Sequence, residues 1–191
     1  MTDFAVTRRE PSLAWWGMAM FIAAEATLFG VMVATYFYLR FKNVEWPPQG
    51  IPKPALAVPL VLLGVLLLTS VPMQLALVAA HARRLAAVRW LLALALFVQA
   101  GYFAMQVHQY ADDLARFTPS EHAYGSIYYT LLGADHAHVA LGLLLNLWLL
   151  GKLARGLTRY RLNALSAITF YWHAVNAITI VVTLTTLSPA L

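Results

Sequence analysis

The sequence predicts an all-α fold, a polytopic membrane bundle of five transmembrane helices. Composition is the first indication: 61% of the residues are hydrophobic and only 11% are charged, whereas charged residues make up roughly a quarter of an ordinary soluble domain. The second is the recurrence, along the whole chain, of apolar stretches of about 20 residues, the length that a helix needs to cross a bilayer core. No linker or separate soluble segment is apparent, so we expect residues 1–191 to form a single membrane domain.

Short polar segments divide the chain into five predicted spans. These spans are 14–40, 56–81, 86–110, 124–151 and 161–187. The first ends before the proline-rich segment 42–54, in which Pro47 and Pro48 lack the amide hydrogen that a helix interior requires. An arginine cluster follows the second span, acidic residues follow the third, and basic residues separate the fourth from the fifth. Pro72 lies inside the second span, where we expect a kink.

The basic residues outside the spans predict the orientation of the chain. When successive loops are assigned to alternate sides, nine of the 13 lysines and arginines fall on the side of the N-terminus and four on the other. Because cytoplasmic loops are enriched in Lys and Arg, we expect the N-terminus in the cytoplasm and the C-terminus outside. The net positive charge therefore reflects topology, and no nucleic acid is expected as a partner.

The sequence excludes all chemistry that depends on cysteine and argues against one class of transporter. It contains no cysteine, which excludes disulfides, thiolate metal sites and thiol nucleophiles. The odd number of spans and the lack of an internal repeat argue against a transporter built from two inverted halves. Any chemistry is therefore expected at the few polar side chains inside the membrane.

Glu25 is one of these side chains, about ten residues into the first span. Its neighbours at helical spacing are Phe21, Ile22, Leu28 and Phe29, which offer no polar partner. A carboxyl in hydrocarbon is expected to be neutral or to find a partner on another helix. Two interpretations remain open: a protonated side chain bonded to a neighbouring helix, or a role in proton handling or lipid contact.

The fourth and fifth spans carry a second set of polar residues near mid-membrane. The phrase ADHAHVALG contains Asp135, His136 and His138, and the phrase YWHAVN contains His173 and Asn176. Asp135 and His138 are three residues apart and lie on one face of a helix, whereas His136 points elsewhere. His173 and Asn176 share a face of the last span at comparable depth.

Three interpretations of these residues compete. Metal binding requires convergent ligands, but His136 and His138 diverge on a helix. A pair of haem ligands that face each other across helices at matched depth could come only from His138 and His173, and His81 and His108 lie at opposite ends of their spans. Interhelical hydrogen bonding that joins the fourth and fifth spans is the favoured interpretation, and Gln99 and Gln106 on the third span are expected to serve similarly.

Four phrases, in this order and at about this spacing, resemble subunit III of haem–copper terminal oxidases. They are WWGMAMFIAAEATLFG, WPPQGI, YGSIYYTLLGADHAHVALGL and YWHAVNAI. The resemblance covers roughly residues 12–187 and identifies Trp46, Pro47, Pro48 and Gly50 as the family's outer loop between two spans. It implies the shorter five-helix form of the family, whose fuller form has two further helices ahead of Trp15.

The resemblance also suggests roles for single residues. Glu25 falls at the family's intramembrane carboxylate, the site that reacts with carbodiimide in relatives. His138 falls on the histidine of the family's His-Val pair, and His173 on that of its Tyr-Trp-His motif. These matches imply that Glu25 is the proton-handling or lipid-facing residue of the chain.

Three positions depart from the family pattern. Asp135 stands where the family usually has a histidine, Asn176 where it has an aspartate, and Gln109 where a glutamate is common. We therefore expect that one histidine–aspartate pair has been exchanged for a bond between Asp135 and either His138 or His173. The departures indicate a diverged branch, such as an oxidase in an unusual supercomplex.

The family implies a non-catalytic accessory subunit in the bacterial cytoplasmic membrane. Such a subunit packs against the catalytic oxidase subunit and other membrane subunits of the complex, and the haem and copper are expected in these partners. It binds phospholipid and holds no metal or redox cofactor itself. It supports proton uptake and stability during oxygen reduction by a cytochrome c or quinol oxidase. The alternatives are an accessory subunit of a nitric oxide reductase, a proton-coupled transporter or channel that uses Glu25 and Asp135, and a haem b membrane anchor.

Overall fold

A computed structural model describes residues 12–190 as an all-α bundle. Its elements are α1 (Leu13–Lys42), α2 (Ala57–Leu68), α3 (Ser70–His81), α4 (Leu85–Leu114), α5 (Ala123–Leu153), α6 (Arg159–Leu187) and the 3₁₀-helix η1 (Ser188–Ala190). Because α2 and α3 together make one span, the described residues contain five helices that are long and apolar enough to cross a membrane. The predicted fold class and number of spans are confirmed, and each span lies close to its predicted bounds.

The second span is interrupted at Thr69, three residues before Pro72. Proline supplies no amide hydrogen and its ring crowds the preceding turn, so the backbone bonds of a regular helix cannot all form there. The Thr69 hydroxyl satisfies one of the local carbonyls by donating to Leu66 O. The same hydroxyl accepts a bond of 2.8 Å from the indole Nε1 of Trp172 on α6, so the break expected from the sequence is also a contact point between two spans.

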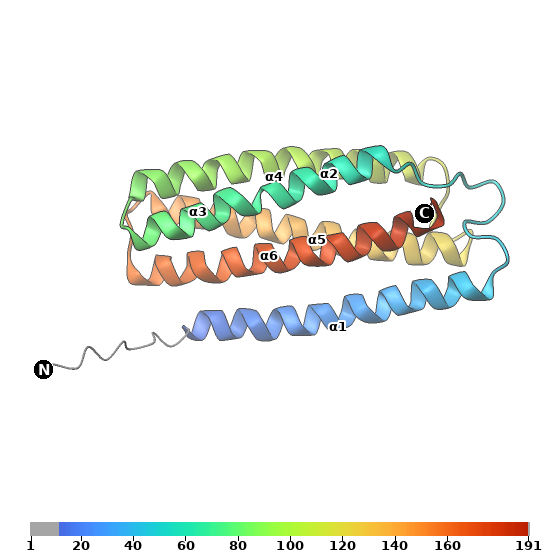
Figure 1. The fold of residues 1–191 in the computed structure, drawn as a ribbon, viewed down its shortest axis with the longest axis horizontal. Coiled ribbons are helices and arrows are strands. Elements are labelled where there is room, and N and C mark those ends of the chain that lie inside the picture. The colour runs from blue at the N-terminus through green and yellow to red at the C-terminus, as the bar shows by residue number, and fades with distance from the viewer. Residues whose placement is uncertain (1–11, 191) are drawn as a thin grey trace, which may run out of the picture.

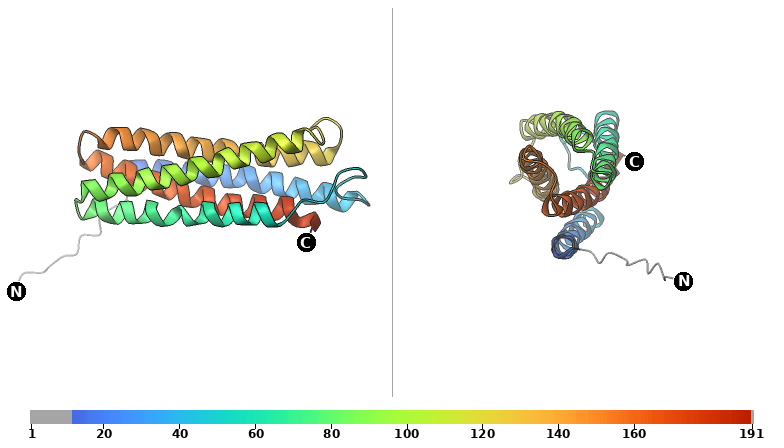
Figure 2. Two further views of the ribbon diagram at one scale, coloured as in Figure 1. Left: turned by 90° about the horizontal axis from the view of Figure 1, so that it is seen from above. Right: turned by 90° about the vertical axis from the view of Figure 1, so that its left-hand side faces the viewer.

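The helices form a ring of four spans with a fifth placed outside it. The α2–α3 pair, α4, α5 and α6 surround a common core, while α1 packs against α5 and α6 only, among the described helices (Figure 2). The start of α1 and the end of α6 lie at opposite ends of the bundle (Figure 1). The intramembrane side chains of α1 can therefore reach the ring only through α5 and α6.

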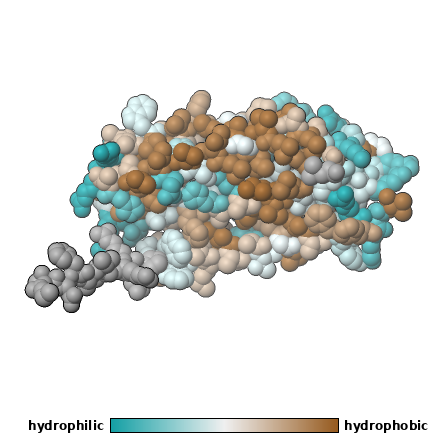
Figure 3. All heavy atoms as spheres, viewed as in Figure 1, coloured by the Kyte–Doolittle hydropathy of each residue, from teal (hydrophilic) through white to brown (hydrophobic). Residues whose placement is uncertain are grey.

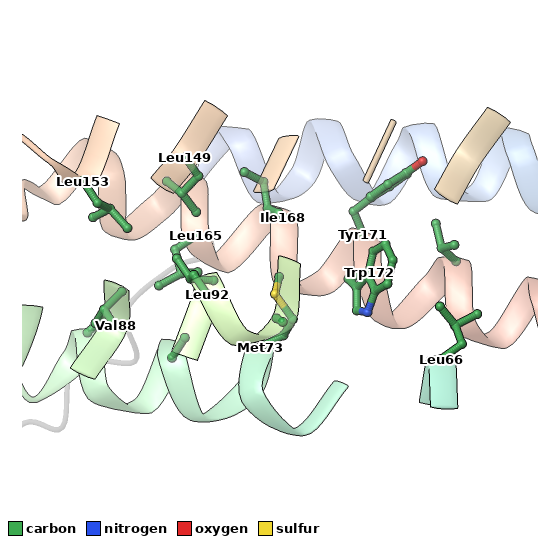
Figure 4. Packing of buried hydrophobic residues seen from close by; sticks show 14 of the residues in the cluster. Leu66, Met73, Val88, Leu92, Leu149, Leu153, Leu165, Ile168, Tyr171 and Trp172 are labelled. Carbon is green, nitrogen blue, oxygen red and sulfur yellow. The ribbon is translucent and has the colours of Figure 1, made fainter. Parts of the chain in front are cut away.

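The main core lies inside the ring and is built from fully buried apolar side chains. Leu66, Met73, Leu92, Leu165 and Trp172 meet there from α2, α3, α4 and α6 (Figure 4). Trp172 is the largest of them and fills the space beside α5. It fits because α5 has a glycine at position 142, where an added Cβ would lie 2.6 Å from the indole ring.

A second, aromatic cluster closes the end of the bundle where the loop between α1 and α2 lies. The ring of Trp46 stands edge-on to Tyr36 of α1 at 5.4 Å and to Tyr124 of α5 at 5.0 Å. Gly50 in the same loop has a φ of +89°, a left-handed conformation that side chains disfavour. The WPPQG phrase thus turns the chain between two spans and anchors the turn through its tryptophan.

The outer surface of the bundle suits a bilayer. On α1, large apolar side chains point away from the ring, among them Leu13, which is 89% exposed, and Phe41, which is 84% exposed. Hydrophobic surface dominates the central part of the face in Figure 3, and hydrophilic residues gather mainly toward its two ends. This distribution agrees with five spans that cross the same membrane.

Candidate functional site: an intramembrane carboxyl–imidazole pair

The partner of Glu25 is His138 of α5. The carboxyl Oε2 lies 3.1 Å from the imidazole Nε2, and the side chains of Glu25 and His138 are 22% and 13% exposed. As expected, the partner comes from another helix. The contact forms because α1 packs directly against α5.

The other ring nitrogen of His138 determines the chemistry of this pair. Nδ1 lies 2.7 Å from the carbonyl oxygen of Ala134. A carbonyl only accepts hydrogen bonds, so Nδ1 carries a proton and Nε2 faces Glu25. One further proton then lies between the two side chains, on the carboxyl of a neutral pair or on the imidazole of an ion pair. Both arrangements have no net charge, which makes the pair tolerable within a membrane.

Neighbouring aromatic residues hold His138 in place. The ring of Phe29 on α1 stands edge-on to the imidazole with a centroid separation of 5.2 Å. Tyr171 of α6 donates its hydroxyl to the backbone carbonyl of His138 over 2.9 Å. The site therefore joins three spans, with the carboxyl from α1, the imidazole from α5 and a positioning bond from α6.

Asp135 does not belong to this pair, and its expected bond to a histidine is wrong. The residue is 2% exposed, and its Oδ1 accepts a bond of 2.7 Å from Thr179 of α6. His138 lies three residues further along α5, but its ring extends toward α1 and its Nδ1 bonds within its own helix. His136 turns toward α4, where its ring meets Tyr110 at 5.4 Å.

His173 and Asn176 bond to α3, not to the fourth span as expected. The imidazole Nδ1 of His173 lies 3.2 Å from Ser70 Oγ, and its Nε2 lies 3.3 Å from Gln74 Oε1. The amide of Asn176 donates to the same Ser70 hydroxyl over 2.6 Å. The contacts of Ser70 and Gln74 with the last span were not predicted, although two polar residues beside an intramembrane proline were a usable signal.

The glutamines of the third span behave differently from each other. Gln99 accepts a bond of 3.1 Å from Asn146 of α5, an interhelical contact of the expected kind. Gln106 instead donates to the hydroxyl of Tyr102 in its own helix over 2.6 Å. The direct polar contacts between α5 and α6 are made by Thr179 with Asp135 and by Tyr171 with the carbonyl of His138.

A cavity of about 310 Å³ with both polar and apolar lining residues opens at the end of the bundle that carries the α1–α2 loop. Its wall includes Lys53, Asp113, Arg116, Tyr128 and His136. Within residues 12–190, no three His, Asp or Glu side chains come close enough together to hold a metal ion.

Known proteins resemble this chain over most of its length. A family model described as cytochrome c oxidase subunit III matches residues 9–187. The cytochrome c oxidase subunit 3 of Bacillus subtilis is 26% identical over 167 residues, which are 85% of this chain and 79% of the relative. The cytochrome bo(3) ubiquinol oxidase subunit 3 of Pseudomonas aeruginosa is 29% identical over 87% of this chain and 80% of its own length. A probable cytochrome c oxidase subunit 3 of Nocardia farcinica is 28% identical over 91% and 89%.

Proposed function

We propose a function for this chain from the family to which it belongs, the cytochrome c oxidase subunit III family, a non-catalytic part of haem–copper oxidase complexes. Through Glu25 and His138, the chain supports proton uptake by a respiratory oxidase and its endurance, which is its resistance to inactivation over many turnovers. It packs against the catalytic subunit, which holds the haem and copper. It spans a bacterial cytoplasmic membrane with its N-terminus inside, as one membrane domain, and contacts phospholipid. The electron donor of the complex is cytochrome c or a quinol, the two kinds of oxidase represented among its relatives.

The observation that carries the proposal is the Glu25–His138 contact. Glu25 lies 12 residues after the first residue of α1, about 18 Å along a helix that rises 1.5 Å per residue. His138 is the central residue of the 31-residue helix α5. A carboxyl and an imidazole 3.1 Å apart at this depth can exchange one proton between them without placing a net charge in hydrocarbon.

The partial exposure of Glu25 supports access from outside the chain. A fully enclosed pair would be a structural bond only, but the Glu25 side chain is 22% exposed. That opening allows a water molecule or a group of the adjoining subunit to reach the carboxyl. Lipid contact is supported by the apolar side chains that α1 presents along its whole length.

The test uses the assembled oxidase with Glu25→Gln. Glutamine keeps the size and hydrogen bonding of the side chain but cannot release a proton, so the subunit should still copurify with the haem-bearing subunit. Initial oxygen consumption should change little, because the chemistry lies in another chain. Proton uptake and the number of turnovers before inactivation should fall.

The matched control is Glu45→Gln, the same substitution in the loop between α1 and α2, where Glu45 is exposed and bonds to Gln49. It should leave copurification, initial oxygen consumption, proton uptake and the number of turnovers before inactivation unchanged. If Glu25→Gln assembled normally and kept full proton uptake and endurance, Glu25 would be a packing residue. If the native chain failed to copurify with a haem-bearing subunit, the assignment as an oxidase subunit would be overturned.

A further inference from the structure

Four side chains form a polar cluster between α3 and α6, here called the α3–α6 polar cluster: Ser70, Gln74, His173 and Asn176. Ser70 lies at its centre, in contact with His173 and Asn176, and Gln74 lies at its edge, 3.3 Å from His173. None of these residues contributes to the Glu25–His138 pair. The cluster is therefore a separate polar feature of the membrane-spanning region.

The hydrogen bonds of the cluster run in one direction. The amide nitrogen of Asn176 can only donate, so it donates to Ser70 Oγ, and the Ser70 hydroxyl is free to donate to Nδ1 of His173. Gln74 Oε1 can only accept, so Nε2 of His173 donates to it. The chain of bonds ends at the amide nitrogen of Gln74, which has no hydrogen-bond partner within residues 12–190.

Gln74 presents this free amide nitrogen at a depth where lipid cannot accept a hydrogen bond. It lies seven residues before His81, the end of α3, which is about 10 Å along the helix. The 25 residues of the second span measure about 37 Å, some 7 Å more than a hydrocarbon core of about 30 Å. Gln74 is therefore well inside the core, away from the ester and phosphate oxygens of the lipids.

The exposed side chains around Gln74 form a stripe along α3. Val71, Leu75 and Val78 are 54%, 49% and 57% exposed, and Gln74 itself is exposed. Positions 71, 74, 75 and 78 follow the spacing of one helix face. This face is apolar except for one amide, a pattern that suits a partner helix with a single polar side chain at matching depth.

We propose that a transmembrane helix of an adjoining oxidase subunit covers this stripe and supplies a hydrogen-bond acceptor to the amide nitrogen of Gln74. The acceptor is a carbonyl, hydroxyl or carboxyl oxygen. The inference rests on the proposed function, because it requires an assembled complex. It goes further by assigning one docking face and the chemistry of the group that meets it.

The absence of cysteine from the sequence permits a direct test of this face. Gln74→Cys carries a nitroxide spin label in the assembled complex in liposomes, and the control label is placed at Phe97→Cys on α4, where Phe97 is 79% exposed. A label covered by a protein helix should be several-fold less accessible to dissolved oxygen than one facing lipid. Equal accessibility at the two positions would overturn the proposal.

Cross-linking from the same cysteine identifies the occupant. Capture of another oxidase subunit supports the proposal, whereas capture of a second copy of this chain, or of lipid only, contradicts it. If the native chain, without any substitution or label, does not copurify with a haem-bearing subunit, the proposed function itself fails, and this inference fails with it. If the chain copurifies but position 74 faces lipid, only the inference fails.

Gln74→Leu tests the hydrogen bond itself. The free energy of an interhelical hydrogen bond in a membrane changes the association equilibrium constant by about threefold to twentyfold. The variant should be lost from the detergent-solubilised complex more readily by that factor. The control Gln106→Leu removes an amide whose nitrogen already bonds to Tyr102 within the chain, and retention should be unchanged. Equal retention of Gln74→Leu and the native chain would contradict the proposal.

Discussion

Gly142 of α5 is the position where a single added methyl group should be most informative about the core. Its Cβ would lie 2.6 Å from Cζ3 and 2.7 Å from Cε3 of Trp172, and 3.4 Å from the ring of Tyr171. Contacts below 3.0 Å require a shift of the neighbouring group. The indole cannot move freely, because it is 1% exposed and its Nε1 donates to Thr69 over 2.8 Å.

The size of the effect follows from two opposing contributions. Overpacking a well-filled core costs about 1–3 kcal/mol, while replacing glycine by alanine inside a helix gains about 1 kcal/mol. The matched control is Gly101→Ala in α4, where an added Cβ meets no atom within 4 Å. The helical gain is common to both variants, so Gly142→Ala should be less stable than Gly101→Ala by about 1–3 kcal/mol.

Thermal unfolding of the purified oxidase subunit in detergent measures this difference. Gly101→Ala should melt at or above the temperature of the native chain, and Gly142→Ala below it. The double variant Gly142→Ala with Trp172→Leu should lose less stability than the sum of its single changes, because a smaller side chain leaves room for the methyl group. Equal melting temperatures for the two alanine variants would refute the reasoning from the packing of Trp172.

Two further predictions concern polar contacts between helices. Asp135→Ala leaves the hydroxyl of Thr179 without its acceptor and should reduce the free energy of unfolding by about 1–3 kcal/mol. Asp135→Asn keeps an acceptor and should reduce it less. Equal decreases in melting temperature for the two variants would count against the hydrogen bond. Arg89 donates to Leu153 O over 2.7 Å and to the next carbonyl over 3.0 Å, so it satisfies the end of α5. Arg89→Gln should therefore reduce the free energy of unfolding by about 1.5–3 kcal/mol, which lowers the melting temperature. The control is Arg159→Gln, which changes an exposed arginine at the start of α6. Equal melting temperatures of the two variants would show that the bonds of Arg89 do not stabilise the protein.

The five spans could be predicted from the sequence because they depend on local properties. Hydrocarbon tolerates a helix of about 20 apolar residues whatever surrounds it, so composition and length alone indicated each span. The break in the second span followed in the same way, since Pro72 disrupts the backbone bonds of its own helix. The need of Glu25 for a partner on another helix was also local information, because its own helix offers only apolar neighbours.

The identity of each polar partner depended on how the helices are rotated and shifted against one another, which the sequence did not reveal. Spacing placed Asp135 and His138 on one face, yet α5 borders both α1 and α6, so the two side chains reach different helices. The same geometry brought Ser70 to His173, which are 103 residues apart. Helical spacing restricts which side chains share a face, but only tertiary packing decides which helix that face meets, and this is why the Glu25–His138 pair emerged from the structure.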